Sequence, residues 1–165
     1  MRTSERSGRA VIAPDMAPHE LREGCYLVST DPSLLDVPRV HAWLTKSYWA
    51  EGITLDAVTR SIERSIPFGA YHQGVQVGVA RVISDTSTLA YVADVFVDEA
   101  HRGRGLGKLL MRAVMSHPDL QEVRRWLLGT RDAHGLYVQF GFGPLERPER
   151  WMEAAAPDVY KHEGG

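Results

Sequence analysis

The chain has 165 residues, 44% hydrophobic and 24% charged, a balance that is ordinary for one globular domain. Its formal net charge of −2 gives no general attraction to nucleic acid or to an anionic membrane, so we expect neither as a partner. The only cysteine, Cys25, excludes an internal disulfide and a cysteine-based metal cluster, and no apolar run reaches membrane-spanning length, so we expect a cytoplasmic protein without a metal.

The first 24 residues are rich in Arg, Ser, Glu and Pro and hold too few apolar side chains to offset the entropy lost on ordering. We therefore expect a mobile extension over residues 1–24. Residues 26–29 predict the first strand, and Cys25 beside it reads as a small buried hydrophobe rather than a nucleophile. Apolar spacing then predicts two helices, over residues 34–44 and 56–65.

The middle of the chain predicts an antiparallel meander. Residues 67–71 and 75–83 form two expected strands, joined by a hairpin turn at Gln73 and Gly74. The third expected strand, residues 89–97, ends in a nearly continuous apolar run, which is typical of a strand covered on both faces.

A strand–helix–strand unit follows. An amphipathic helix begins at Leu106 and is closed by Pro118, and the return strand over residues 123–128 is expected to lie parallel to residues 89–97 by the right-handed crossover rule. The sequence next predicts a helix over residues 133–140. Two short strands complete the expected domain of residues 25–156, before a frayed tail over residues 157–165; these strands are residues 143–145 and 150–152.

The turn before the helix at Leu106 reads Arg-Gly-Arg-Gly-Leu-Gly-Lys, residues 102–108. Its glycines let the backbone turn tightly and approach a ligand, and the first N–H groups of a helix have no internal partner, so they attract phosphate. A Walker A loop would need glycine where Arg102 stands and Ser or Thr where Leu109 stands. A Rossmann fingerprint would need a third glycine. Counted from Gly103 that position is Lys108, and counted from Gly105 it is Leu110.

The spacing Arg-x-x-Gly-x-Gly from Arg102 to Gly107 resembles the signature of the GNAT superfamily of acetyl-CoA-dependent N-acetyltransferases. Downstream, DAHGLYVQFGF is similar to the superfamily's Leu-Tyr-x-x-x-Gly-Phe element, in which Gly141 ends a helix and Phe142 packs back on it. The resemblance implies an α/β (α+β) GNAT fold. That fold has a mixed sheet of about six to seven strands, an antiparallel meander leading into a splayed parallel pair, and about four flanking helices.

The resemblance also implies the residues that bind acetyl-CoA. The splayed strand would pair with pantetheine through its backbone, and the loop would bind the pyrophosphate through its N–H groups. Thr130 stands where members of the family often carry an Asn that binds pantetheine, which leaves that contact open. The implied cofactor-binding residues are Val95, Phe96, Val97, Arg102, Gly103, Arg104, Gly105, Leu106, Gly107, Lys108, Thr130 and Tyr137.

Four residues are candidates for proton transfer. Tyr137 matches the family's usual acid for the departing thiolate, although its place on an apolar stripe also suits a core tyrosine. Asp94, His134 and Glu51 are the candidate bases, with water as a further possibility. For Asp94, an ion pair with Arg81 is the slightly favoured interpretation. Trp49 and Glu51 could hold and orient an amine, or serve only as a packing aromatic and a solvated acid.

The sequence therefore predicts an enzyme, active as monomer or homodimer, that moves an acetyl group from acetyl-CoA to a primary amine. The acceptor is expected to be a small molecule, and the amine to attack directly in a ternary complex. Three alternatives stay open. The chain could acetylate proteins, it could bind CoA as a sensor without catalysis, or its loop could hold a nucleotide other than CoA.

Overall fold

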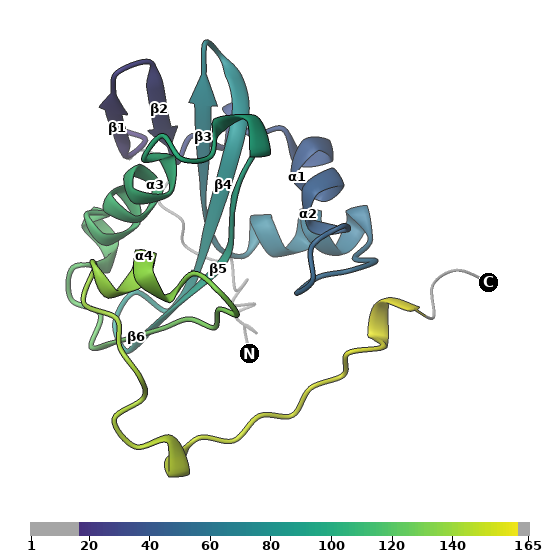
Figure 1. Ribbon diagram of the computed structural model, residues 1–165, viewed down its shortest axis with the longest axis vertical. Helices are drawn as coiled ribbons and strands as arrows, with labels where there is room; N and C mark the ends of the chain where they lie inside the picture. Colours follow the sequence, from purple (N-terminus) through teal and green to yellow (C-terminus); the bar gives the residue numbers. More distant parts are fainter. Residues whose placement is uncertain (1–16, 162–165) are drawn as a thin grey trace, which may run out of the picture.

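Six strands form one mixed sheet in the computed structural model, which describes residues 17–161 (Figure 1). Strands β1 to β5 pair antiparallel, whereas β5 and β6 pair parallel. This confirms the expected meander leading into a parallel pair. The strands lie side by side in chain order: β1 (Glu20–Glu23), β2 (Tyr26–Ser29), β3 (Ile66–His72), β4 (Val75–Ser84), β5 (Leu89–Val97) and β6 (Arg125–Leu127).

The described helices cover both faces of the sheet. On one face, α1 (Val37–Leu44) and α2 (Leu55–Glu63) bury a cluster that includes Val79 of β4. On the other, α3 (Leu106–Met115) and α4 (His134–Val138) bury a larger cluster that includes Ala80. Because neighbouring strand residues point to opposite faces, one continuously apolar strand serves both layers. No helix within residues 17–161 is long and apolar enough to cross a bilayer.

Side-chain caps start α1 and α2, whereas α3 and α4 have no such cap. The carboxylate of Asp36 accepts the N–H of Arg39 at 3.1 Å and starts α1, and the hydroxyl of Thr54 starts α2 in the same way. In contrast, α3 begins after Gly105, which has no side chain and a φ of 79°. The first turn of α3 is therefore left without a capping group. Short 3-10 turns complete the described elements at Pro32–Leu34, Glu99–His101, Pro118–Leu120, Pro148–Arg150 and Val159–Lys161.

The N-terminal part of the chain differs from the prediction where it is described. Glu20–Glu23 forms β1 and pairs with β2, although we expected residues 1–24 to be a mobile extension. Backbone pairing and the packing of Leu21 against the core hold this polar edge strand in place. Residues 1–16 lie outside the described residues. Cys25 lies in the β1–β2 turn and is exposed, so the prediction that it is buried was wrong.

The predicted strands after α4 are absent. Residues 143–145 and 150–152 form no strand, and the described chain beyond Phe142 runs away from the sheet (Figure 1). A 3-10 turn at Pro148–Arg150 interrupts this segment, and the Trp151 ring lies against the guanidinium of Arg125 in β6. The return strand is also shorter than expected, since β6 covers only Arg125–Leu127. Pro144 and Pro148 explain part of the difference, because proline has no N–H to donate to a sheet. The sheet therefore ends at a short edge strand.

Candidate active site

The loop between β5 and α3 presents a run of free backbone N–H groups. The first of these N–H groups with a protein acceptor is that of Leu109, which donates to the Gly105 carbonyl at 3.0 Å; no described residue accepts those from Gly103 to Lys108. Gly103 and Gly105 have φ of 75° and 79°, and no heavy atom lies within 4 Å of where a Cβ would stand. The loop is thus open, backbone-lined and suited to an anion.

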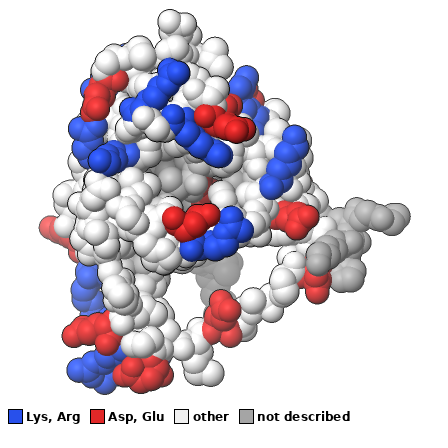
Figure 2. Space-filling view, viewed as in Figure 1, with Lys and Arg blue, Asp and Glu red and all other residues white. Residues whose placement is uncertain are grey.

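Positive side chains surround this loop but do not all point outward. Arg102 turns back, donating from Nε to the Val97 carbonyl at 2.9 Å, with its guanidinium 5.4 Å from the centre of the Phe96 ring. Arg102 therefore fastens the loop to β5. Arg104 and Lys108 are exposed and form no ion pair within residues 17–161. Figure 2 shows Lys and Arg side chains gathered over the end of the sheet where β5 passes into α3.

Next to the loop, the parallel strands separate. β5 and β6 pair only from Leu89 opposite Arg125 to Tyr91 opposite Leu127, so Val95–Val97 has no strand partner on that side. On the β4 side, the register passes from Val79 opposite Phe96 to Arg81 opposite Ala93. One extra residue of β5 therefore forms a bulge. An extended ligand could pair with the free edge of Val95–Val97.

Asp94 occupies this bulge with a φ of 55°, and both of its carboxylate oxygens are engaged. Arg81 donates from Nε at 2.9 Å, which confirms the expected ion pair, and both side chains are largely buried. The indole N–H of Trp49 donates to the other oxygen at 3.0 Å. Asp94 thus ties the loop between α1 and α2 to the bulge, a link that sequence reasoning missed because the two residues lie 45 positions apart.

Tyr48 lies in the same loop between α1 and α2 and contacts the segment that follows β6, on the other side of the opening between β5 and β6. Its hydroxyl accepts the backbone N–H of Arg131 at 3.1 Å, and the Arg131 guanidinium lies 3.9 Å from the centre of its ring. Tyr48 and Trp49 pack edge to face with ring centres 5.0 Å apart. No sequence pattern joins Tyr48 to Arg131, so neither residue was singled out as functional.

Tyr137 is buried on α4 beside this loop. Burial raises the pKa of Tyr137, and the nearby Tyr48 raises it further, so the phenol is protonated at neutral pH. Gly141 adopts a φ of 88°, and the Phe142 N–H donates to the Tyr137 carbonyl at 3.3 Å. This helix end has the form expected from the second motif.

The remaining candidates are more peripheral. His134 is the first residue of α4 and is exposed, as is Glu51. The hydroxyl of Thr130 accepts the Ala133 N–H at 3.0 Å, so it supports the turn into α4. Within residues 17–161, no group of three or more His, Cys, Asp or Glu could hold a metal ion.

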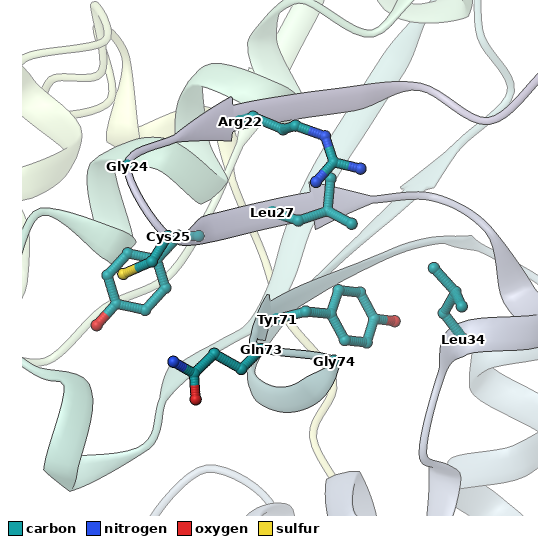
Figure 3. Close-up of a pocket in the computed structure, with 9 residues that line it drawn as sticks. Arg22, Gly24, Cys25, Leu27, Leu34, Tyr71, Gln73 and Gly74 are labelled. Atoms are coloured by element: carbon teal, nitrogen blue, oxygen red, sulfur yellow. The ribbon is translucent and has the colours of Figure 1, made fainter.

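A larger cavity than the one beside this loop lies elsewhere. It measures about 430 Å³ and lies between the β1–β2 and β3–β4 hairpins, where Figure 3 shows Leu27, Leu34 and Tyr71 around it. A smaller cavity of about 220 Å³ lies beside Arg104 and Gly105, on the side facing Cys25. Cavity size is therefore a poor guide to this site, because a shallow, backbone-lined loop encloses little volume.

A sheet that opens between two parallel strands, next to a helix start with free N–H groups, defines the class of acetyltransferases that the sequence motifs resemble. Comparison with known families agrees. The chain belongs to the acetyltransferase (GNAT) family, whose pattern matches residues 28–142.

Individual relatives support the same assignment. A Gibberella zeae protein, FG08082, whose name marks it as an inferred acetyltransferase, is 33% identical over 144 residues, covering 73% of this chain and 80% of its own. A crystal structure of an inferred GNAT acetyltransferase from Xanthomonas campestris is 51% identical with a TM-score of 0.80, covering 82% of this chain and 96% of that one. An inferred Clostridium acetobutylicum acetyltransferase, crystallised with acetyl-CoA, shares the fold at 14% identity and a TM-score of 0.58, covering 79% and 94%.

Proposed function

We propose that this protein is an N-acetyltransferase of the cytoplasm that moves the acetyl group of acetyl-CoA to the primary amine of a small molecule. The observation that carries the proposal is the run of N–H groups from Gly103 to Lys108 without a protein acceptor. These donors suit a pyrophosphate, and the free edge of Val95–Val97 suits the amides of pantetheine.

In this proposal the protein acts mainly by positioning. An amine is a good nucleophile and a thioester is already activated, so holding both near attack distance supplies about 7–11 kcal/mol. A backbone N–H of β5 directed at the thioester oxygen would add about 3–4 kcal/mol as charge develops on it. Tyr137 is the proposed acid for the departing thiolate, because its phenol is protonated at neutral pH. Burial raises the pKa of Tyr137, which makes it a weak acid, so the proposed contribution is modest.

The proposed route for the amine proton follows from how the candidate bases are held. Asp94 already accepts hydrogen bonds from Arg81 and Trp49, so we assign it a positioning role for the loop that carries Trp49. His134 and Glu51 are exposed, so water reaches both side chains. Water relayed to either residue is therefore the proposed path.

The test is release of free CoA thiol from acetyl-CoA in the presence of a panel of amines. We expect at least one small primary amine to accelerate release above the hydrolysis background. If only peptides or proteins accelerate it, the small-molecule acceptor is wrong. If CoA binds and no acceptor accelerates release, the chain is a CoA-binding sensor and the enzyme proposal fails.

A further inference from the structure

The cavity between the β1–β2 and β3–β4 hairpins is separate from the proposed acetyl-CoA site, because none of its lining residues belongs to that site (Figure 3). Its volume is about 430 Å³. Small-molecule sites in proteins usually measure about 300–1,000 Å³ and combine a mainly apolar lining with a few polar groups. The side chains around this cavity have that composition, and their positions indicate which ligand would fit.

Three strands place one row of side chains along the cavity. Arg22 of β1 lies opposite Leu27 of β2, and Leu27 lies opposite Tyr71 of β3. Val28 and Ala70 belong to the cluster beneath α3, so their neighbours Leu27 and Tyr71 point to the other face of the sheet. Because adjacent strands lie about 4.8 Å apart, the row spans about 10 Å from a guanidinium-bearing residue to a phenol.

Tyr71 gives the cavity a hydrogen-bond donor that no residue within 17–161 uses. The residue is 4% exposed, and its hydroxyl has no hydrogen-bond partner in that part of the chain. Figure 3 shows this hydroxyl directed toward Leu34, which also lines the cavity. Burial raises the pKa of Tyr71, and the negative charges of Asp31 and Asp36 raise it further, so the hydroxyl keeps its proton. A buried donor without an acceptor costs free energy, which a ligand oxygen would recover.

Arg22 supplies positive charge at the other end of the row. Its side chain is 71% exposed, and the nitrogen–oxygen distance in its ion pair with Glu20 is 3.8 Å, too long for a hydrogen bond. The other carboxylate oxygen of Glu20 accepts the hydroxyl of Ser29. No Asp or Glu is among the described residues that line the cavity. Arg22 is therefore able to pair with an anionic group of a ligand.

Between these two ends the lining is apolar. Leu27 and Leu34 line the cavity together with Tyr71, and Leu34 is 45% exposed although it is a large hydrophobic residue. An apolar ligand body that covers these side chains removes them from water, which favours binding. A negative charge at the Tyr71 end would be repelled by Asp31 and Asp36. The lining thus suits an apolar body with one anionic end and one neutral polar end.

We propose that this cavity binds a small amphipathic carboxylate whose far end carries a neutral oxygen, as in a medium-chain hydroxy or keto acid. The carboxylate pairs with Arg22, and the neutral oxygen accepts a hydrogen bond from Tyr71. The carbon chain between them lies against Leu27 and Leu34.

The first test is calorimetric titration of the full chain with ω-hydroxyoctanoate, with and without excess acetyl-CoA. We expect saturable binding under both conditions. Leu34→Glu should raise the dissociation constant at least tenfold, because it places a carboxylate beside the carbon chain. Leu55→Glu is the matched control, since Leu55 is also 45% exposed but lies on α2 and does not line the cavity.

Three outcomes of this titration would overturn the proposal. The first is the absence of saturable binding, and the second is an equal effect of the two substitutions. The third is displacement of the probe by acetyl-CoA, which would place the probe in the loop before α3.

Two further comparisons test the ends of the ligand. Octanoate lacks the neutral oxygen and should bind the wild-type chain about 2- to 10-fold more weakly than ω-hydroxyoctanoate, whereas Tyr71→Phe should bind both equally. The corresponding octane diol lacks the carboxylate and should bind about 2- to 5-fold more weakly, whereas Arg22→Gln should bind the diol and the hydroxy acid equally. A preference that persists in the matching variant would refute the assignment of that end.

Cys25 gives a readout that does not depend on calorimetry, because it lines the cavity, is exposed and is the only cysteine of the chain. Saturating ω-hydroxyoctanoate should slow alkylation of Cys25 by iodoacetamide in the wild-type chain and in Leu55→Glu, but not in Leu34→Glu. An unchanged rate in the wild-type chain would overturn the proposed location.

Discussion

At the scale of single residues, Tyr71 stands out because its hydroxyl is buried without a hydrogen-bond partner among the described residues. The hydroxyl lies over Gly69, where an added Cβ would come within 2.1 Å of it. We predict that Tyr71→Phe raises the free energy of unfolding by about 1 kcal/mol, because an unsatisfied buried group is removed and the ring is kept. Urea unfolding measures the change.

Tyr26→Phe is the matched control for that experiment. The Tyr26 hydroxyl lies 2.9 Å from Nδ1 of His101, so its removal breaks an existing hydrogen bond. Stability should fall by about 1 kcal/mol. Equal effects of the two substitutions would contradict the account given for Tyr71.

Tyr137→Phe tests the proposed acid. We predict that kcat falls by about 10²-fold or less and that KM for acetyl-CoA is unchanged, because the raised pKa keeps the phenol protonated and a thiolate leaves without full protonation. Steady-state kinetics check this. Val138→Ala changes the neighbouring residue, 63% exposed on the same helix, and should leave kcat intact.

The lowered pKa of His117 allows a prediction of how the free energy of unfolding depends on pH. Burial lowers the pKa of His117 below its ordinary value of 6.5, outweighing the opposite effect of Asp119, and Nδ1 accepts the Asp119 N–H at 3.2 Å. The unfolded chain therefore binds the proton more tightly, and stability should fall as pH drops below about 6.5. His117→Asn keeps an acceptor but does not titrate, so unfolding measured between pH 7 and 5 should show a shallower decline. An identical slope would exclude His117 as a source.

At the scale of elements, the start of α3 makes the sharpest prediction. Gly105→Asp should abolish binding of acetyl-CoA, because it places a carboxylate among the N–H groups proposed to hold phosphate. Calorimetric titration measures the affinity. Gly74→Asp is the matched control, since Gly74 has a φ of 78° and an equally open surrounding but lies in a distant hairpin. Unchanged affinity in Gly105→Asp would refute the assignment of this loop.

The helices and strands also show which structural features local sequence patterns predict well. The meander of β3, β4 and β5 and the stripe of α3 were predicted because apolar periodicity directly reflects which face is buried. β1 was missed because Glu20–Glu23 is held by backbone pairing, which leaves little mark on sequence. Residues 143–145 and 150–152 were predicted as strands from their side chains alone, but they pair with no strand within residues 17–161.

At the scale of the whole molecule, ligand binding should stabilise the fold. Acetyl-CoA at about 100 times its dissociation constant should add about 2.7 kcal/mol to the free energy of unfolding. We expect a larger rise in melting temperature with acetyl-CoA than with equal concentrations of ATP or NAD. A larger rise with either nucleotide would favour the alternative ligand for the loop.

The sequence by itself determined the family, the meander of β3, β4 and β5, and the glycine-rich turn that we propose binds phosphate, because glycine spacing and apolar periodicity are local properties of the chain. Only the tertiary structure joined Asp94 to Trp49 and Tyr48 to Arg131, because these pairs come from segments that meet through folding alone. It also decided that Cys25 faces solvent and that residues 143–145 and 150–152 join no strand. Both outcomes depend on which surfaces of the core are still uncovered when a segment could pack on them. A local sequence pattern does not contain that information.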